Sequence, residues 1–132
     1  MNQTKVVPTQ VPQPQVPVLS AESKKRLPAP VLLGRLKAER IEQPLAASKI
    51  LEAMNGLPGW GLSPKAFHLY RVFYFPGGGE AQAFADYLQH MGRGLKVQMT
   101  VTIEKERVYL KVRGKRGGVP EYLLDFAALL SQ

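Results

Sequence analysis

The chain has 132 residues, and 18 lysines and arginines against 10 acidic residues give it a formal net charge of +8. This length allows one domain with a tail. The absence of cysteine excludes a disulfide framework, a thiol nucleophile and a cysteine-based zinc site, and two histidines are too few for a multi-histidine metal site. We therefore expect no metal and no cofactor. The positive charge favours an acidic partner, either a protein with an acidic surface or a nucleic acid.

Neither a membrane span nor a secretory signal is evident. No apolar run approaches the roughly 20 residues that a spanning helix needs. The N-terminus lacks a charged region followed by an apolar block. We expect no membrane partner and a cytoplasmic location, with an organelle stroma or matrix left open.

Residues 1–29 are rich in proline and glutamine and contain the basic cluster Lys24-Lys25-Arg26. Closely spaced prolines prevent helices and sheet ladders and favour extended conformations. We predict a disordered basic tail. An arm that docks on a partner and an organelle transit peptide are the alternatives.

Residues 30–55 have the apolar spacing of helices. Pro44 interrupts this spacing because it has no N–H group to donate. We therefore predict a helical connector over 30–43 and a second helix that ends near Asn55-Gly56. Whether the connector packs on the domain or projects from it is left open. The apolar side of the second helix comprises Leu45, Ile50, Leu51 and Met54.

Aromatic residues concentrate in 66–75, just after a Pro58-Gly59 turn that Trp60 closes. This segment is predicted to be a strand or a hairpin of its own, and its aromatic side chains favour a core nucleated here. Strand side chains alternate between faces. One face would carry Leu69, Arg71, Phe73 and Phe75, and the other Tyr70, Val72 and Tyr74.

A glycine-rich loop, Pro76-Gly77-Gly78-Gly79, precedes the next predicted helix. Such a loop can hold a phosphate, but no Lys-Ser/Thr pair follows and the spacing differs from a dinucleotide fingerprint. A flexible connection between strand and helix fits better. The helix runs from Glu80 to Met91, and Gly92 and Gly94 are expected to end it.

Residues 95–113 alternate between apolar and polar side chains on both sides of Lys105-Glu106. This pattern predicts an antiparallel hairpin with one buried and one polar face. A basic glycine loop over 114–118 leads to a final helix that Pro120 opens. The whole order predicts an α+β fold whose antiparallel sheet is covered on one face by helices.

The hairpin and its flanking loops carry a local excess of positive charge. An aromatic residue among cations could stack a base beside a nucleic-acid backbone. A solvated face with charges that protect the sheet edge is the alternative. His68 and His90 are isolated, so we predict no catalytic residue. The candidate binding surface comprises Arg93, Lys96, Arg107, Tyr109, Lys111, Arg113, Lys115 and Arg116.

Several motifs together resemble the pterin-4a-carbinolamine dehydratases, which are also dimerisation cofactors of a homeodomain transcription factor. The resemblance covers about residues 45–130 and implies a four-stranded antiparallel sheet, a dehydratase-like domain over 44–132 and association into homodimers or higher oligomers. The motifs are Leu57-Pro58-Gly59-Trp60, Leu69-x-Arg71-x-Phe73-x-Phe75, Ala83-Phe84, Val108-x-Leu110 and the helix containing Phe126-Ala127.

The family's active-site histidines are absent from the matching segments. Its His-His-Pro motif would fall in 92–98, and its second histidine segment near Arg113-Gly114-Lys115. Lysine and arginine are poor proton acceptors. The sequence thus predicts a degenerate, non-catalytic member that acts as a protein-binding adaptor, by analogy with Rubisco assembly factors. The alternatives are a nucleic-acid-binding module using 93–116 and a residual dehydratase with pterin near His90.

Overall fold

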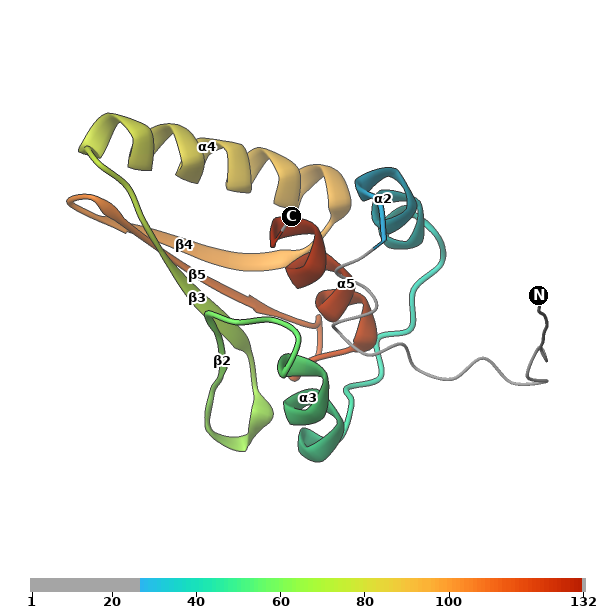
Figure 1. Ribbon diagram of the computed structural model, residues 1–132. Helices are drawn as coiled ribbons and strands as arrows, with labels where there is room; N and C mark the ends of the chain where they lie inside the picture. Colours follow the sequence, from blue (N-terminus) through green and yellow to red (C-terminus); the bar gives the residue numbers. More distant parts are fainter. Residues whose placement is uncertain (1–26, 132) are drawn as a thin grey trace, which may run out of the picture.

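The computed structural model describes residues 27–131, and its helices and strands form an α+β fold, as predicted (Figure 1). Most of the predicted tail, residues 1–26, lies outside the described residues. The helices are α2 (Ala29–Lys37), α3 (Ala47–Met54), α4 (Gly78–Leu95) and α5 (Glu121–Leu130). The strands are β2 (Trp60–Leu62), β3 (Leu69–Tyr74), β4 (Gln98–Glu104) and β5 (Arg107–Arg113), and a 3-10 turn spans Pro64–Ala66.

The four strands form one antiparallel sheet in the order β2-β3-β5-β4. The predicted hairpin is confirmed: β4 and β5 pair along their whole length. A second hairpin joins β2 to β3, with Trp60 opposite Arg71. The segment 66–75, predicted as a strand or a hairpin of its own, contains only one strand, β3, and the partner strand β2 lies before it. Consequently β5 is a central strand, whereas β4 and the short β2 are edges.

The helices lie on one side of this sheet and cover one of its faces (Figure 1). Alternate side chains of β5 point into the core, where Val108, Leu110 and Val112 are fully buried. In α5 the unbroken run Tyr122–Ala128 is buried. The run is apolar except for Asp125, whose Oδ1 lies 3.4 Å from Nε of Arg35 in α2. Burial over a whole run places α5 inside the domain. No helix of residues 27–131 lies on the other face of the sheet.

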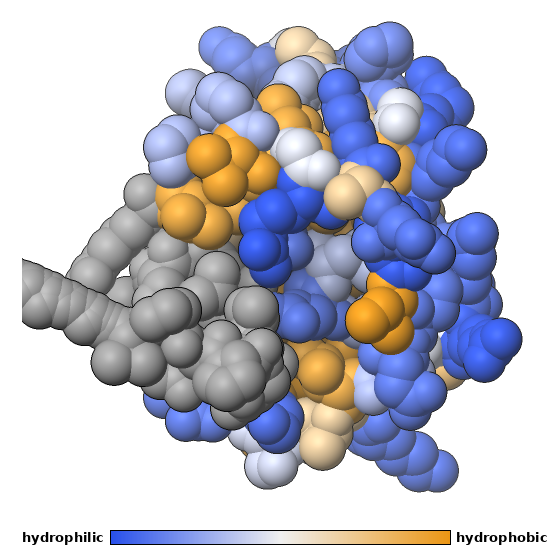
Figure 2. Space-filling model, turned by 90° about the vertical axis from the view of Figure 1, so that its right-hand side faces the viewer, coloured by the Kyte–Doolittle hydropathy of each residue, from blue (hydrophilic) through white to orange (hydrophobic). Residues whose placement is uncertain are grey.

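Helix α2 packs on the domain, which answers the question that the sequence left open. Its Leu32 and Leu36 belong to the core and are 0% and 2% exposed. The chain after α2 is extended, and Pro44 forms an isolated bridge with Pro120. Figure 2 shows this end of the molecule, where hydrophilic groups predominate and the coloured hydrophobic patches are separate.

Two helix predictions were wrong in detail. Helix α4 does not end at Gly92 or Gly94 but continues to Leu95. Gly92 lies inside the helix against the side chain of Met99: a Cβ there would lie 2.5 Å from Cε of Met99, so the methionine side chain would have to move. In α3 the predicted core residue Leu51 is 55% exposed, whereas Ala53 is buried.

The segment between α2 and α3 holds the C-terminal end of α4 through Arg40. The two Nη atoms of Arg40 donate to the backbone oxygens of Leu95 and Lys96, each over 2.7 Å. The same guanidinium lies 4.0 Å from the ring centroid of Tyr122 in α5. Carbonyls at a helix end lack partners within the helix and attract cations. Arg40 therefore fixes α4 to α5 and to the connecting segment.

We expect replacement of Arg40 by alanine to lower the free energy of unfolding by about 2 kcal/mol, because two charged hydrogen bonds and a cation–π contact are lost. Arg40→Lys keeps the charge without the planar fork and should lose about half as much. Urea unfolding followed by circular dichroism measures both values. A change below about 0.5 kcal/mol for Arg40→Ala, the range of ordinary surface substitutions, would contradict the assignment.

Candidate functional site

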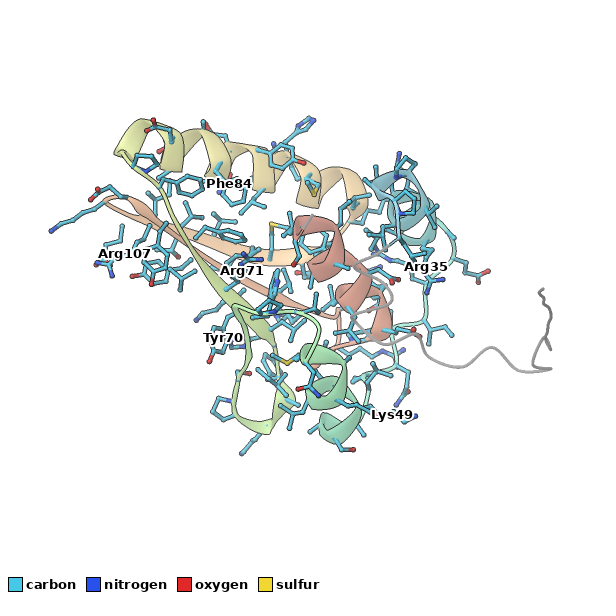
Figure 3. All side chains as sticks on the ribbon, in the orientation of Figure 1. Arg35, Lys49, Tyr70, Arg71, Phe84 and Arg107 are labelled. Carbon is cyan, nitrogen blue, oxygen red and sulfur yellow. The ribbon has the colours of Figure 1, made fainter. Side chains whose placement is uncertain are left out.

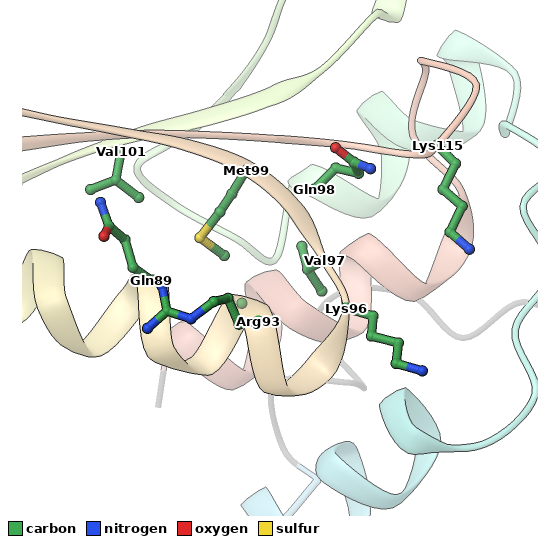
Figure 4. Close-up of a pocket in the computed structure, with 9 residues that line it drawn as sticks. Gln89, Arg93, Lys96, Val97, Gln98, Met99, Val101 and Lys115 are labelled. Atoms are coloured by element: carbon green, nitrogen blue, oxygen red, sulfur yellow. The ribbon is translucent and has the colours of Figure 1, made fainter.

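A cavity of about 430 Å³ opens where α4 ends and β4 begins (Figure 4). Arg93 belongs to the last turn of α4, Lys96 is the residue after the helix, and Lys115 comes from the loop that follows β5. Figure 4 shows Arg93 beside Gln89 and the two lysines at the other end of the lining. The lining residues are Gln89, Gly92, Arg93, Lys96, Val97, Gln98, Met99, Val101 and Lys115.

Backbone geometry places these cations at the cavity. Lys96 has a left-handed φ of 56°, and the Val97 N–H donates to the Gly92 oxygen over 2.9 Å, which reverses the chain from α4 into β4. The Lys115 N–H donates to Oε1 of Glu42 over 3.1 Å, so the connecting segment also fixes the second rim of the cavity. The positions of the cations are thus set by hydrogen-bonded turns.

The lining provides hydrogen-bond donors and positive charge but no group suited to accept a proton. Ammonium and guanidinium groups are donors only, and the two glutamine amides are not bases. His90 is exposed on α4 and does not line the cavity. Residues 27–131 contain no cluster of three His, Cys, Asp or Glu side chains able to hold a metal ion. This arrangement can bind an anionic group, such as a carboxylate.

The uncovered face of the sheet is a second candidate surface, which we call the open face. It combines alternate residues of three strands: Tyr70, Val72 and Tyr74 from β3; Arg107, Tyr109, Lys111 and Arg113 from β5; and Gln98, Thr100, Thr102 and Glu104 from β4. In Figure 3, Tyr70 and Arg107 lie away from the helices, whereas Arg71 and Phe84 lie between sheet and helices. Three tyrosines therefore share the face with three cations.

Each tyrosine of the open face has a distinct setting. Tyr74 is 73% exposed. The Tyr70 ring lies over Gly61 of β2, where an added Cβ would come within 2.2 Å of the ring. The Tyr109 hydroxyl donates to Oε1 of Glu104 over 3.0 Å, and this hydrogen bond raises the pKa of Tyr109. Two of the three rings are thus held in place and the third is free in solvent.

A smaller cavity of about 250 Å³ lies at one end of the open face. His68 and Phe67 line it together with the cations Lys111 and Arg113. Partial burial, and then the charge of Lys111, lower the pKa of His68. The remaining lining residues are Gln98, Met99 and Thr100.

The eight residues of the predicted surface do not form one continuous site. Arg93, Lys96 and Lys115 surround the cavity at the end of α4. Arg107, Tyr109, Lys111 and Arg113 belong to the open face, and Arg116 is exposed in the loop after β5. Sequence reasoning counted a single tyrosine on this face. The alternation of Tyr70 and Tyr74 was recognised, but only the β3–β5 register shows that they join Tyr109.

Comparison with known proteins supports the fold. No protein-family model and no curated protein matches the chain significantly. Among solved structures, the chain is similar to the crystal structure of a transcriptional coactivator/pterin dehydratase from Brucella melitensis, with a TM-score of 0.58 and 22% sequence identity. The match covers 64% of this chain and 92% of that one. At this identity the likeness shows a common fold, and it confirms the predicted helix-covered, four-stranded sheet.

The described part of the chain contains no helix with the length and apolar character required to cross a bilayer.

Tyr122 should make the stability of the domain depend on alkaline pH, because its hydroxyl donates to Glu42, the residue that also holds the loop of Lys115 at the cavity. Burial, and then the Glu42 carboxylate that accepts its hydroxyl over 3.1 Å, raise the pKa of Tyr122 to about 12. A raised pKa stabilises the folded protein fully below the unfolded value near 10, and this stabilisation is lost as the pH rises towards 12. We expect the free energy of unfolding to fall across this interval, and Tyr122→Phe to flatten the fall.

Urea unfolding at several pH values within that interval measures the effect. Tyr87→Phe, at an exposed ring of α4, is the matched control and should keep the wild-type pH dependence. Parallel pH profiles for Tyr122→Phe and the wild type would be inconsistent with a raised pKa at Tyr122.

Proposed function

We propose that the chain is a non-catalytic protein with the dehydratase-like fold, and that it acts as an adaptor for a protein partner with an acidic surface. One observation carries this proposal. The segment 92–98 and Lys115, which align with histidine segments of the dehydratases by resemblance, line one cavity, and they supply cations and amides in place of imidazoles. A site lined by cations and amides, with no proton acceptor, is suited to binding rather than to loss of water.

The chemistry of the lining indicates the partner's character. Arginine and lysine form their strongest hydrogen bonds with carboxylates and phosphates. The cations stand on a helix end and on a loop that Glu42 holds, so little ordering is required when an acidic side chain enters. A role in assembling another protein, as in the Rubisco assembly factors, is an analogy of fold.

The absence of catalysis is tested by a dehydratase assay on 4a-hydroxytetrahydropterin. We expect the full chain to leave the spontaneous rate of dehydration unchanged, because the lining offers no proton acceptor. A pterin-4a-carbinolamine dehydratase that retains its histidines serves as positive control. Turnover well above the spontaneous rate, abolished by His90→Ala, would instead establish the residual dehydratase.

The adaptor role is tested by cross-linked capture from nuclease-treated native lysate. Arg93→Glu/Lys115→Glu reverses two charges at the cavity, and Lys37→Glu/Lys49→Glu reverses two exposed charges on α2 and α3. We expect wild type and the second variant to recover the same protein, and the first to recover at least about tenfold less, because buried charge pairs contribute more than exposed ones. Equal recovery by both variants would contradict the assigned surface.

The chain is further proposed to form a homodimer through β4. This strand is an edge of the sheet, and within residues 27–131 its seven residues pair with β5 alone. An unpaired strand edge of this length is a template for pairing with a second chain. Pairing of two β4 strands would join two sheets and bring their open faces side by side.

Light scattering after gel filtration should therefore give twice the 14.6 kDa chain mass. Thr100→Lys/Thr102→Lys places charges along the edge and should yield the monomer. Gln82→Lys/Ala83→Lys adds the same charge on the exposed side of α4 and should leave the dimer intact. A monomeric wild type, or equal dissociation of both variants, would rule out β4 as the interface.

A further inference from the structure

The open face repeats one chemical pattern along the two central strands. Successive pairs across β3 and β5 are Tyr70 with Lys111, Val72 with Tyr109, and Tyr74 with Arg107. Each pair thus contains one tyrosine, and the first and third also contain a cation. Side chains two residues apart on a strand are separated by about 6.8 Å, so the rings form a row rather than a single cluster.

The rings of this row are accessible and partly held in place. Tyr74 and Tyr70 are 73% and 42% exposed. Because one side of the Tyr70 ring covers Gly61, its other side is turned outward. The Glu104 carboxylate holds the Tyr109 hydroxyl. Aromatic rings with few rotatable bonds and fixed neighbours lose little entropy when a flat group stacks on them.

The charges beside the rings favour an anionic strand. Arg107, Lys111 and Arg113 lie in one line along β5. Among the open-face residues of β3, β4 and β5 the only acid is Glu104, which already bonds Tyr109 and lies 3.9 Å from Arg107. The neighbouring residues of β4 are uncharged donors and acceptors. The small cavity at the end of the row adds the ring of His68, which lines it together with two cations.

From this juxtaposition we infer that the open face binds single-stranded nucleic acid, with bases stacked on Tyr70, Tyr109 and Tyr74 and phosphates bound by Arg107, Lys111 and Arg113. Aromatic rings that alternate with cations are how proteins bind single strands without sequence preference. A protein interface would favour an apolar centre without charges. Among the residues named for this face, Val72 is the only aliphatic side chain.

The inference is separate from the adaptor proposal, because none of the tyrosines and cations that carry it lines the cavity at the end of α4. Of the residues named for the open face, only Gln98 also lines that cavity. Binding of the full chain to fluorescein-labelled 12-mers of oligo(rU) and oligo(dT), and to a duplex of the same length, is measured by fluorescence anisotropy. We expect the single strands to bind at least about tenfold more tightly than the duplex. Three phosphate contacts predict that log K falls with log salt concentration with a slope near −2, at about −0.7 per contact.

Tyr74→Ala tests stacking most directly, since this ring is the most exposed of the three. Loss of one stacked base corresponds to roughly 5- to 100-fold weaker binding. Tyr74→Phe keeps the ring and should bind like the wild type, which separates stacking from loss of the hydroxyl. Tyr87→Ala removes a ring of similar exposure from α4 and is the matched control for a change in surface aromatic content.

Charge is tested by two double variants of equal net charge. Arg107→Glu/Lys111→Glu should abolish binding of the single strands, whereas Arg93→Glu/Lys115→Glu at the cavity should retain at least half of the affinity. Equal weakening by the two would mean that overall charge, or another part of the chain, binds the oligonucleotides, and would overturn the inference. Undetectable binding at 50 mM NaCl, equal affinity for duplex, or an unchanged affinity in Tyr74→Ala would overturn it as well.

Protein capture provides the last discriminating result. One outcome is that the wild type does not bind oligonucleotides and that Arg107→Glu/Lys111→Glu no longer recovers a nuclease-resistant protein. The open face would then bind a protein partner, and the inference fails. If that variant loses oligonucleotide binding and still captures the protein, the open face and the cavity are separate sites, as inferred.

Discussion

The guanidinium of Arg40 joins three parts of the domain that are distant in the sequence. It binds the last carbonyls of α4 and lies over the ring of Tyr122 in α5, while Glu42, two residues on, holds both the Tyr122 hydroxyl and the loop after β5. Without this contact the end of α4 would have unpaired carbonyls next to the core. The width of the cavity between α4 and β4 depends on where α4 is held. The segment between α2 and α3 therefore determines the geometry of the site, although it does not line the cavity.

The two faces of the sheet have different physical roles. On the helix side, Val108, Leu110 and Val112 exclude water and stabilise the fold. On the opposite side the same strand carries Arg107, Tyr109 and Lys111, which add little to the core and are therefore free to vary with function. One strand thus supports a binding surface without compromising stability, because its side chains alternate. The cavity and the open face share Gln98, but their cations are different residues and can be replaced separately.

Local periodicity was sufficient to predict the fold class. The regular alternation over 95–113 identified the hairpin, because burial on one face imposes a period of two. Features that depend on contacts between distant segments were not predicted. Gly92 was predicted to end the helix, but it lies inside α4, where the side chain of Met99 packs against it. Likewise, the eight predicted basic-surface residues are divided among separate places because α4 ends beside β4. Three tyrosines meet on one face because of the register between β3 and β5. Neither feature can be read from a single segment of the sequence.

The central place of β5 has a consequence for synthesis. Both β3 and β4 pair with β5, yet β5 is translated after them, and α5, which closes the core, follows β5. While the ribosome is still making residues 107–130, the nascent chain has two unsatisfied strand edges and an uncovered apolar face, which are features that promote aggregation. The contacts that complete the core link early and late residues, so collapse cannot proceed gradually from the N-terminus. The sheet and the core can therefore close only after the last helix has been made.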